Sequence, residues 1–342
     1  MVQDEDISHS ANENNHGFMA DPVTPLNKLV NSDDYASKME LLIMDVQAEV
    51  CKSLQDHEDG ATFLVDKWKK DGHTGGGITC VLQDGKTFEK AGVNISVVHG
   101  SLSEGAEKHM RSRGKSLKRF PDNTLPFIAM GVSSVIHPTN PYCPTLHFNY
   151  RYFEVTNGDN TKLWWYGGGT DLTPMYYDET DFTHFHKTLK SACDMHDKGL
   201  YPKYKKWCDD YFFIPIRGES RGIGGIFFDD MDYPNQEFVH NFVKSCAKAV
   251  LPCYMPIIEK NKNKLFTSAQ KLWQQVRRGR YVEFNLVYDR GTKFGFQTPG
   301  ARIESILMSL PLTARWEYMN IPKIGSEEHK LWQVLKNPQD WV

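Results

Sequence analysis

Residues 145–173, with the sequence TLHFNYRYFEVTNGDNTKLWWYGGGTDLT, decide the fold. Polar and apolar side chains alternate strictly from Thr145 to Tyr152, which is the pattern of a β-strand with one buried face. A second run, rich in aromatic residues and lying at 162–167, leads into three glycines. We therefore expect strands over 145–155 and 162–167, with the glycines forming a turn, a β-bulge or a ligand-binding loop.

Short runs of β-branched or aromatic residues on either side of this stretch predict five further strands. They lie at 78–82, 87–98, 127–136, 223–229 and 281–288. Apolar residues recur at helical spacing in three places, namely 38–55, 182–193 and 238–250. A capping box of Thr267 and Gln270 begins a fourth helix, which Gly279 should end. Strands in near succession followed by helices are typical of an α+β fold with a largely antiparallel sheet.

Composition narrows the class of protein. The chain has 342 residues, of which 40% are hydrophobic, enough for a sizeable core. We expect one domain over 21–342, because no repeat or linker interrupts it, preceded by a mobile polar tail over 1–20. No stretch reaches about 18 consecutive apolar residues, so no transmembrane segment is predicted. The net charge of −3 argues against binding to nucleic acid.

The same observations set expectations about compartment and metals. The first 26 residues are acidic and contain neither Lys nor Arg, unlike a mitochondrial presequence, so we expect a cytoplasmic protein. Seven scattered cysteines without a C-x-x-C pair indicate neither a disulfide framework nor a zinc site. His137, His147, His184 and His186 are the best metal-ligand candidates, but the chain has no H-E-x-x-H motif. His186 shares its spacing with Phe182 and Leu189, which favours a hydrogen-bonded core histidine.

The alternation after Thr145 places His147, Asn149 and Arg151 on one face of a strand. An imidazole, an amide and a guanidinium this close together could receive a carboxylate and transfer a proton beside it. The alternative is the solvated polar face of an edge strand. Asp171 follows the glycines, which would let a flat ligand approach the main chain, and its carboxylate could accept several N–H donors from a macrocycle.

Two arginine-containing segments remain. Residues 217–230 hold several glycines, but these precede a strand-like run, so a dinucleotide fingerprint is excluded. Arg217 and Arg221 there suit carboxylates, although surface pairing with Glu219 is the alternative. Arg302 follows a predicted turn and should lie near a helix N-terminus. The run Arg277, Arg278 and Arg280 is interpreted as a solvated helix end.

Four segments taken together resemble the oxygen-dependent coproporphyrinogen III oxidases. They are residues 147–154, the motif from Trp164 to Pro174 (WWYGGGTDLTP), residues 217–230 and residues 281–318. The resemblance extends from about Phe18 to Val342. It implies a flat seven-stranded antiparallel sheet covered by helices on both faces, in a single domain, and a homodimer formed through a region within 281–317.

The resemblance also implies the chemistry. Coproporphyrinogen III and two O₂ would give protoporphyrinogen IX, two CO₂ and two H₂O₂, with O₂ as co-substrate and no metal or organic cofactor. His147 would be the proton donor, Arg151 would hold a propionate, and Asp171 would face the pyrrole N–H groups and stabilise charge as a pyrrole is deprotonated. Substrate contacts would come from Ser133, Asn149, Tyr150, Arg151, Gly300, Ala301 and Arg302.

One position departs from part of the family. Some bacterial members carry a histidine directly before the Arg-Gly-Glu motif and have been discussed as binding manganese with it. Here that position is Ile216, which weakens a four-histidine site. Two other functions stay open on the residues alone, namely a non-catalytic tetrapyrrole carrier and a metal-dependent hydrolase that uses the histidines.

Overall fold

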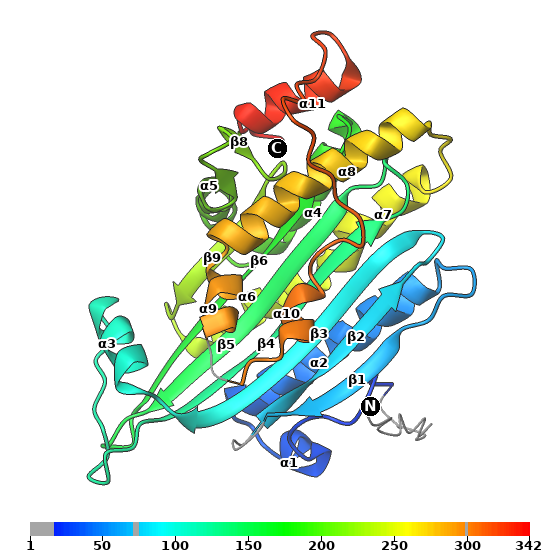
Figure 1. Cartoon of the computed structure of the whole chain (residues 1–342). Helices are drawn as coiled ribbons and strands as arrows, with labels where there is room; N and C mark the ends of the chain where they lie inside the picture. The colour runs from blue at the N-terminus through cyan, green and yellow to red at the C-terminus, as the bar shows by residue number, and fades with distance from the viewer. Residues whose placement is uncertain (1–16, 71–74, 298–299) are drawn as a thin grey trace.

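The computed structural model describes residues 17–70, 75–297 and 300–342. At its centre lies one antiparallel sheet of seven strands in the order β1-β2-β3-β4-β5-β6-β9 (Figure 1). The strands are β1 (Leu64–Lys69), β2 (Gly75–Gln83), β3 (Phe88–Ser101), β4 (Pro126–Pro138), β5 (Thr145–Thr156), β6 (Lys162–Thr173) and β9 (Gly225–Met231). A small separate ribbon pairs β7 (Phe213–Ile214) with β8 (Glu219–Ser220). The predicted α+β fold with an antiparallel sheet is confirmed.

Helices cover both faces of the sheet, as expected (Figure 1). The back face packs against α2 (Tyr35–Gln55), α4 (Glu179–Asp194), α6 (Gln236–Lys248) and α7 (Val250–Asn261). The front face lies under α8 (Ser268–Glu283), α9 (Arg290–Gln297) and α10 (Ile303–Leu307). The remaining helices are α1 (Leu26–Val30), α3 (Glu104–Ser112), α5 (Leu200–Tyr211) and α11 (Glu327–Lys336).

The back face carries the main hydrophobic core. Leu146, Phe148, Tyr150 and Tyr152 of β5 all point to it and are at most 1% exposed. Because side chains of a strand alternate between faces, their intervening neighbours are forced to the front. The core packing on one side of β5 therefore decides which side chains are available for chemistry on the other.

The strand predicted at 281–288 is wrong. These residues form the end of α8 and a π-helix, η1 (Phe284–Tyr288). Aromatic and β-branched residues made the segment resemble a strand, but the capping box at Thr267 begins a helix that continues through Gly279 to Glu283. The expected helix end at Gly279 is wrong for the same reason. The seventh strand is instead β1, an edge strand whose Leu64 is 57% exposed and whose sequence LVDKWK does not alternate between apolar and polar residues.

Residues 1–16 of the predicted tail lie outside the described residues. Phe18, Met19 and Ala20 pack against the core, so packed structure begins before residue 21. All seven cysteines are buried free thiols. None of the helices in the described ranges combines the length and apolar character that crossing a bilayer demands.

Two helical glycines should respond oppositely to alanine. Alanine favours a helix over glycine by about 1 kcal/mol. An added Cβ at Gly105 in α3 meets nothing within 4 Å, so Gly105→Ala should raise the free energy of unfolding. At Gly279 the Cβ would lie 2.7 Å from the carbonyl oxygen of Arg315, so Gly279→Ala should lower it by roughly 1–3 kcal/mol. Denaturant unfolding of both variants checks this, and a gain in both would contradict the packing at Gly279.

Candidate active site

The register of the central strands gathers the predicted residues on the front face. His147 pairs with Asp171 across β5 and β6, and Asn149 pairs with Ser133 across β5 and β4. Directly paired residues point to the same side of a sheet. His147, Asn149 and Arg151 thus share the front face, as the alternation predicted. The strand is central rather than an edge, which excludes the alternative of a solvated edge face.

Asp171 lies inside β6 and not in a loop beyond it, because β6 extends to Thr173. Its Oδ1 receives the Nδ1–H of His147 at 2.7 Å, and its Oδ2 receives Nη2–H of Arg221 at 2.7 Å. The His147 side chain is 22% exposed, whereas that of Asp171 is 3% exposed. The carboxylate therefore holds the imidazole through Nδ1 and leaves Nε2 as the ring nitrogen that can contact a ligand.

This geometry corrects the expectation that Asp171 faces a ligand. Both carboxylate oxygens are used within the chain, and the residue is 2% exposed. Burial opposes ionisation, but the guanidinium of Arg221 and then His147 outweigh it, so the pKa of Asp171 lies below its ordinary value. Asp171 is ionised at neutral pH and acts as a positioning group for His147.

Arg221 differs from its predicted role as a carboxylate-binding loop residue. It is 2% exposed and lies 4.0 Å from the ring of Phe212, with Tyr281 and Phe284 on its other sides at 4.6 and 4.9 Å. Its Nη1 donates to Asn285 at 2.8 Å. A guanidinium so enclosed needs the carboxylate of Asp171 to offset its lost hydration. Sequence patterns could not reveal this pairing, because its partners come from distant segments.

The helix arginines are also more buried than expected, whereas Arg217 of the loop is exposed and pairs with Glu283. Glu219 is 2% exposed and accepts from Arg277 at 2.7 Å, so neither surface pairing of Glu219 nor a solvated Arg277 is correct. Arg278 is fully buried and pairs with Glu89 of β3. The reason is that α8 lies across the front face, which places one side of its last turns in the interior (Figure 1).

Arg151 is an exposed cation on this face, with 39% of its side chain accessible. Its Nη1 donates to Asn149 at 2.8 Å, and its Nη2 lies 2.8 Å from Oδ1 of Asp229. The cross-strand neighbour is Gly167, where an added Cβ would come within 2.7 Å of the guanidinium. Glycine at this position therefore gives Arg151 the space to lie flat along the sheet.

Three glycines lie on the front face near these groups. Gly131 of β4 and Gly167 and Gly169 of β6 all share the face with Arg151 or Asn149 by register. The sheet therefore contributes no side chain at these three positions, and the guanidinium of Arg151 lies over Gly167. A flat ligand can approach such a surface closely.

The structure brings together only some of the predicted substrate contacts. Ser133 faces the front beside Asn149. The Tyr150 side chain points to the back face and hydrogen-bonds Thr170 at 2.7 Å, so only its main chain can take part at the front. Gly300, Ala301 and Arg302 lie toward the β1 edge of the sheet. Arg302 stands at the N-cap position of α10, near a helix N-terminus as expected, but its side chain pairs with Asp66 of β1 and does not cap the helix. Four strand spacings, about 19 Å, separate β1 from β5.

The remaining histidine candidates are engaged in hydrogen bonds. His186 is buried between the Tyr201 hydroxyl and the Ile223 carbonyl, which confirms it as a core histidine, and His137 lies between Thr145 and the Ser309 carbonyl. Burial lowers the pKa of each to about 3, so both are neutral. His184 reaches the Pro252 carbonyl. Among residues 17–70, 75–297 and 300–342, no three His, Cys, Asp or Glu side chains cluster as metal ligands would.

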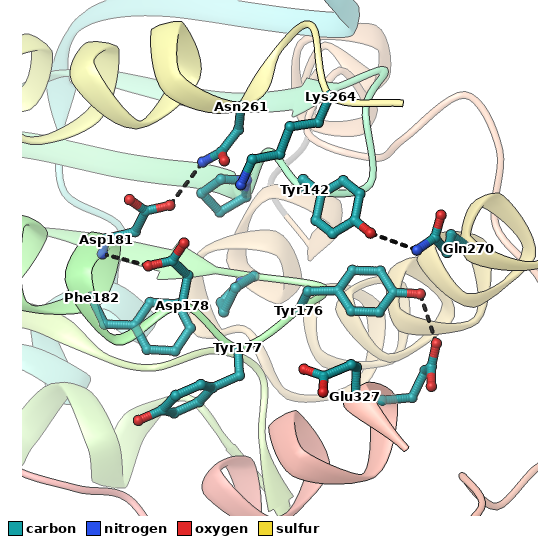
Figure 2. A pocket seen from close by; sticks show the side chains of 13 residues that line it. Tyr142, Tyr176, Tyr177, Asp178, Asp181, Phe182, Asn261, Lys264, Gln270 and Glu327 are labelled. Atoms are coloured by element: carbon teal, nitrogen blue, oxygen red, sulfur yellow. Dashed lines mark hydrogen bonds between the residues drawn. The ribbon is translucent and has the colours of Figure 1, made fainter. Parts of the chain in front are cut away.

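A cavity of about 310 Å³ lies elsewhere, between the starts of α4 and α11 and the end of α7 (Figure 2). Its polar side chains are largely paired with each other. Tyr142 receives a hydrogen bond from Gln270, and Tyr176 donates to Glu328. His147, Asp171 and Arg151 are not among its lining residues. The candidate chemistry therefore belongs to the front face of the sheet and not to this cavity.

An oriented imidazole beside an exposed guanidinium on a glycine-rich sheet face defines an acid–base site for a flat, carboxylate-bearing ligand. The chain belongs to the coproporphyrinogen III oxidase family, whose model matches residues 38–341. A human protein named oxygen-dependent coproporphyrinogen-III oxidase, mitochondrial, is 62% identical over 99% of this chain and 74% of its own length. A Drosophila melanogaster protein named oxygen-dependent coproporphyrinogen-III oxidase is also 62% identical, over 96% of this chain and 84% of its own.

The expectation of a cytoplasmic protein is wrong. Besides the human protein, rat and mouse relatives at 64% and 63% identity are named mitochondrial, and a Glycine max relative at 52% identity is named chloroplastic. The composition of the first residues of this chain is therefore no guide to its compartment.

The substitution Asp171→Asn tests how much the buried ion pair with Arg221 contributes to the free energy of unfolding. Neutralising the carboxylate leaves Arg221 buried without its counter-charge, which should lower the free energy of unfolding by about 3–5 kcal/mol at pH 7. Because the folded pKa of Asp171 is lowered, its stabilising effect is present above the ordinary value of 3.8 and is lost as pH falls further. The difference between wild type and variant should therefore shrink below pH 4.

Denaturant unfolding at several pH values measures this difference. Asp210→Asn is a matched control, because that carboxyl is 65% exposed and pairs only with the exposed Lys206 among the described residues. A gap between wild type and Asp171→Asn that stayed constant from pH 7 to pH 3 would contradict an ionised Asp171.

Proposed function

We propose that this chain oxidatively decarboxylates two propionates of coproporphyrinogen III with O₂, giving protoporphyrinogen IX. The observation that carries the proposal is the His147–Asp171–Arg221 arrangement, which presents one imidazole on the same sheet face as Arg151. Family membership supports the substrate and the reaction. Each turnover at one propionate converts R–CH₂–CH₂–COOH and O₂ into R–CH=CH₂, CO₂ and H₂O₂, which balances atoms and electrons.

The substrate is a flat macrocycle with four carboxylate arms, and the front face suits it in two ways. The glycines of β4 and β6 let the ring lie against main chain. Arg151 can hold one arm through a charge-assisted pair, which fixes the neighbouring ring over His147. Holding the reacting groups in one orientation accounts for much of the rate.

The oxidation needs a proton to leave a pyrrole nitrogen and a hydrogen to leave the propionate carbon. We propose that Nε2 of His147 takes and returns the pyrrole proton while O₂ accepts two electrons and becomes peroxide, which removes the propionate hydrogen as CO₂ departs. Asp171 keeps Nδ1 protonated and stabilises the imidazolium that forms. Because the electron-rich substrate itself reduces O₂, the proposed reaction uses no metal or organic cofactor.

We also propose a homodimer formed through 281–317. Apolar side chains in this region are unusually exposed in the single chain. They are Leu286 (42%), Val287 (48%), Phe296 (42%), Ile303 (46%), Leu312 (39%) and Trp316 (55%). A second copy that covers them would remove this apolar surface from water, as obligate dimers do.

Turnover is tested by mixing pure protein with coproporphyrinogen III without oxygen and then admitting air. Wild type should release CO₂ and vinyl products and consume one O₂ per propionate, with or without a chelator. His147→Gln should lower kcat about 10²- to 10⁴-fold, because it removes proton transfer. Arg151→Gln should chiefly raise KM. A non-catalytic carrier would give no product above background, and activity lost with chelator but restored by Mn²⁺ or Fe²⁺ would contradict the metal-free reaction.

The dimer is tested by Val287→Glu. A charge at this position should separate the subunits, because it cannot be buried without a partner. Sedimentation should show a dimer for wild type and a monomer for the variant. Leu265→Glu is the control, since Leu265 is 95% exposed but lies outside 281–317, and it should stay dimeric. A monomeric wild type would overturn the proposal.

A further inference from the structure

We infer that Asp229 is an internal stand-in for a substrate carboxylate: it occupies the guanidinium groups at the end of β9 until a carboxylate arm of the ligand displaces it. This inference rests on the proposed function for the identity of the ligand. It adds a specificity residue that competes with the substrate instead of binding it.

Three guanidinium groups converge on this one carboxylate. Nη2 of Arg151 lies 2.8 Å from Oδ1 of Asp229, while Nη2 of Arg113 and Nη2 of Arg290 lie 3.4 and 3.8 Å from Oδ2. The arginines come from β5, the segment after α3, and α9. The carboxylate is therefore the centre of the cluster.

A β-bulge in β9 directs the side chain of Asp229 toward the three arginines. Between the pairs Tyr166–Met231 and Gly168–Phe228, the single residue Gly167 of β6 stands opposite both Asp229 and Asp230 of β9. The backbone of Asp230 has φ of 52°, a left-handed conformation that a non-glycine residue adopts at some cost. Bulges commonly redirect a side chain next to a functional site. The extra residue turns Asp229 toward Arg151 beside the glycine-rich face.

The exposed fractions of the four side chains show that a ligand carboxylate can reach the arginines and replace Asp229 as their partner. The Asp229 side chain is 14% exposed, whereas those of Arg113, Arg151 and Arg290 are 34%, 39% and 60% exposed. The arginines can therefore reach an incoming carboxylate while still anchored by their stems. Burial raises the pKa of Asp229, but Arg151 and Arg113 more than offset it, so the pKa lies below its ordinary value and the group is charged.

Charge balance favours one incoming carboxylate. Arg113 also pairs with Asp230, so three cations face two carboxylates in this cluster and leave one positive charge. A single propionate arm neutralises that charge. Without Asp229 the excess would be two positive charges. Ligand carboxylates would then bind more tightly, but the cluster could accept two of them instead of one.

The experiment measures binding separately from turnover. Coproporphyrin III, the oxidised macrocycle that cannot react, is titrated into full-length protein and followed by fluorescence. Asp229→Asn keeps the shape but removes the charge, and should lower Kd by about 2- to 5-fold, the upper part of the range expected when one competing ion pair is removed. Asp229→Ser, a side chain of another shape, should shift Kd in the same direction. Asp229→Glu should stay within about twofold of wild type, since it keeps the charge.

Two controls distinguish competition between Asp229 and the ligand carboxylate from a general effect of removing a negative charge. Asp232→Asn removes the same charge three residues away, where the partner is Lys115, and should leave Kd unchanged. Coproporphyrin III tetramethyl ester has no free carboxylate, so Asp229→Asn should not tighten its binding. If Asp229→Asn and Asp229→Ser bind coproporphyrin III as wild type does or more weakly, Asp229 merely positions Arg151 and the inference is overturned. Turnover of the wild type reports on the proposed function independently of this result.

Discussion

The ion pair between Arg221 and Asp171 is the interaction on which the site depends. Two charges with exposures of about 2% are stable only as a pair, and three aromatic rings enclose the cation. The pair joins the loop before β9 to the C-terminal end of β6, and Asn285 extends it to the π-helix. The imidazole of His147 is therefore held by a rigid interior and not by a mobile loop.

Sequence reasoning succeeded where a pattern repeats along one segment. The alternation after Thr145 predicted which side chains share the front face, because the period of a strand is a property of the strand alone. It failed where the answer depends on distant segments. The partner of Arg221, the burial of Arg277 and the burial of Asp171 depend on contacts between segments that are far apart in the sequence, and no local pattern encodes those contacts.

The segment 281–288 shows why local preference can mislead. Its aromatic and β-branched residues favour a strand, yet Tyr281 and Phe284 are needed on one side of a helix to enclose Arg221. Conversely, β1 was missed because its sequence, LVDKWK, does not alternate between apolar and polar residues. The family resemblance supplied Ser133 and the segment 300–302 as site residues, because no periodicity singles them out. It also grouped Arg302 with the residues around His147, whereas in this chain Arg302 pairs with Asp66 of β1.

The placement of the cysteines takes on meaning beside the proposed reaction, which releases hydrogen peroxide. Peroxide attacks thiolates and hardly touches protonated thiols. All seven sulfur atoms lie in the interior, and burial raises the pKa of Cys143 to about 12. An enzyme built in this way can generate an oxidant over many cycles without damaging its own sulfur chemistry, so its working lifetime should not depend on reductants that repair oxidised cysteine.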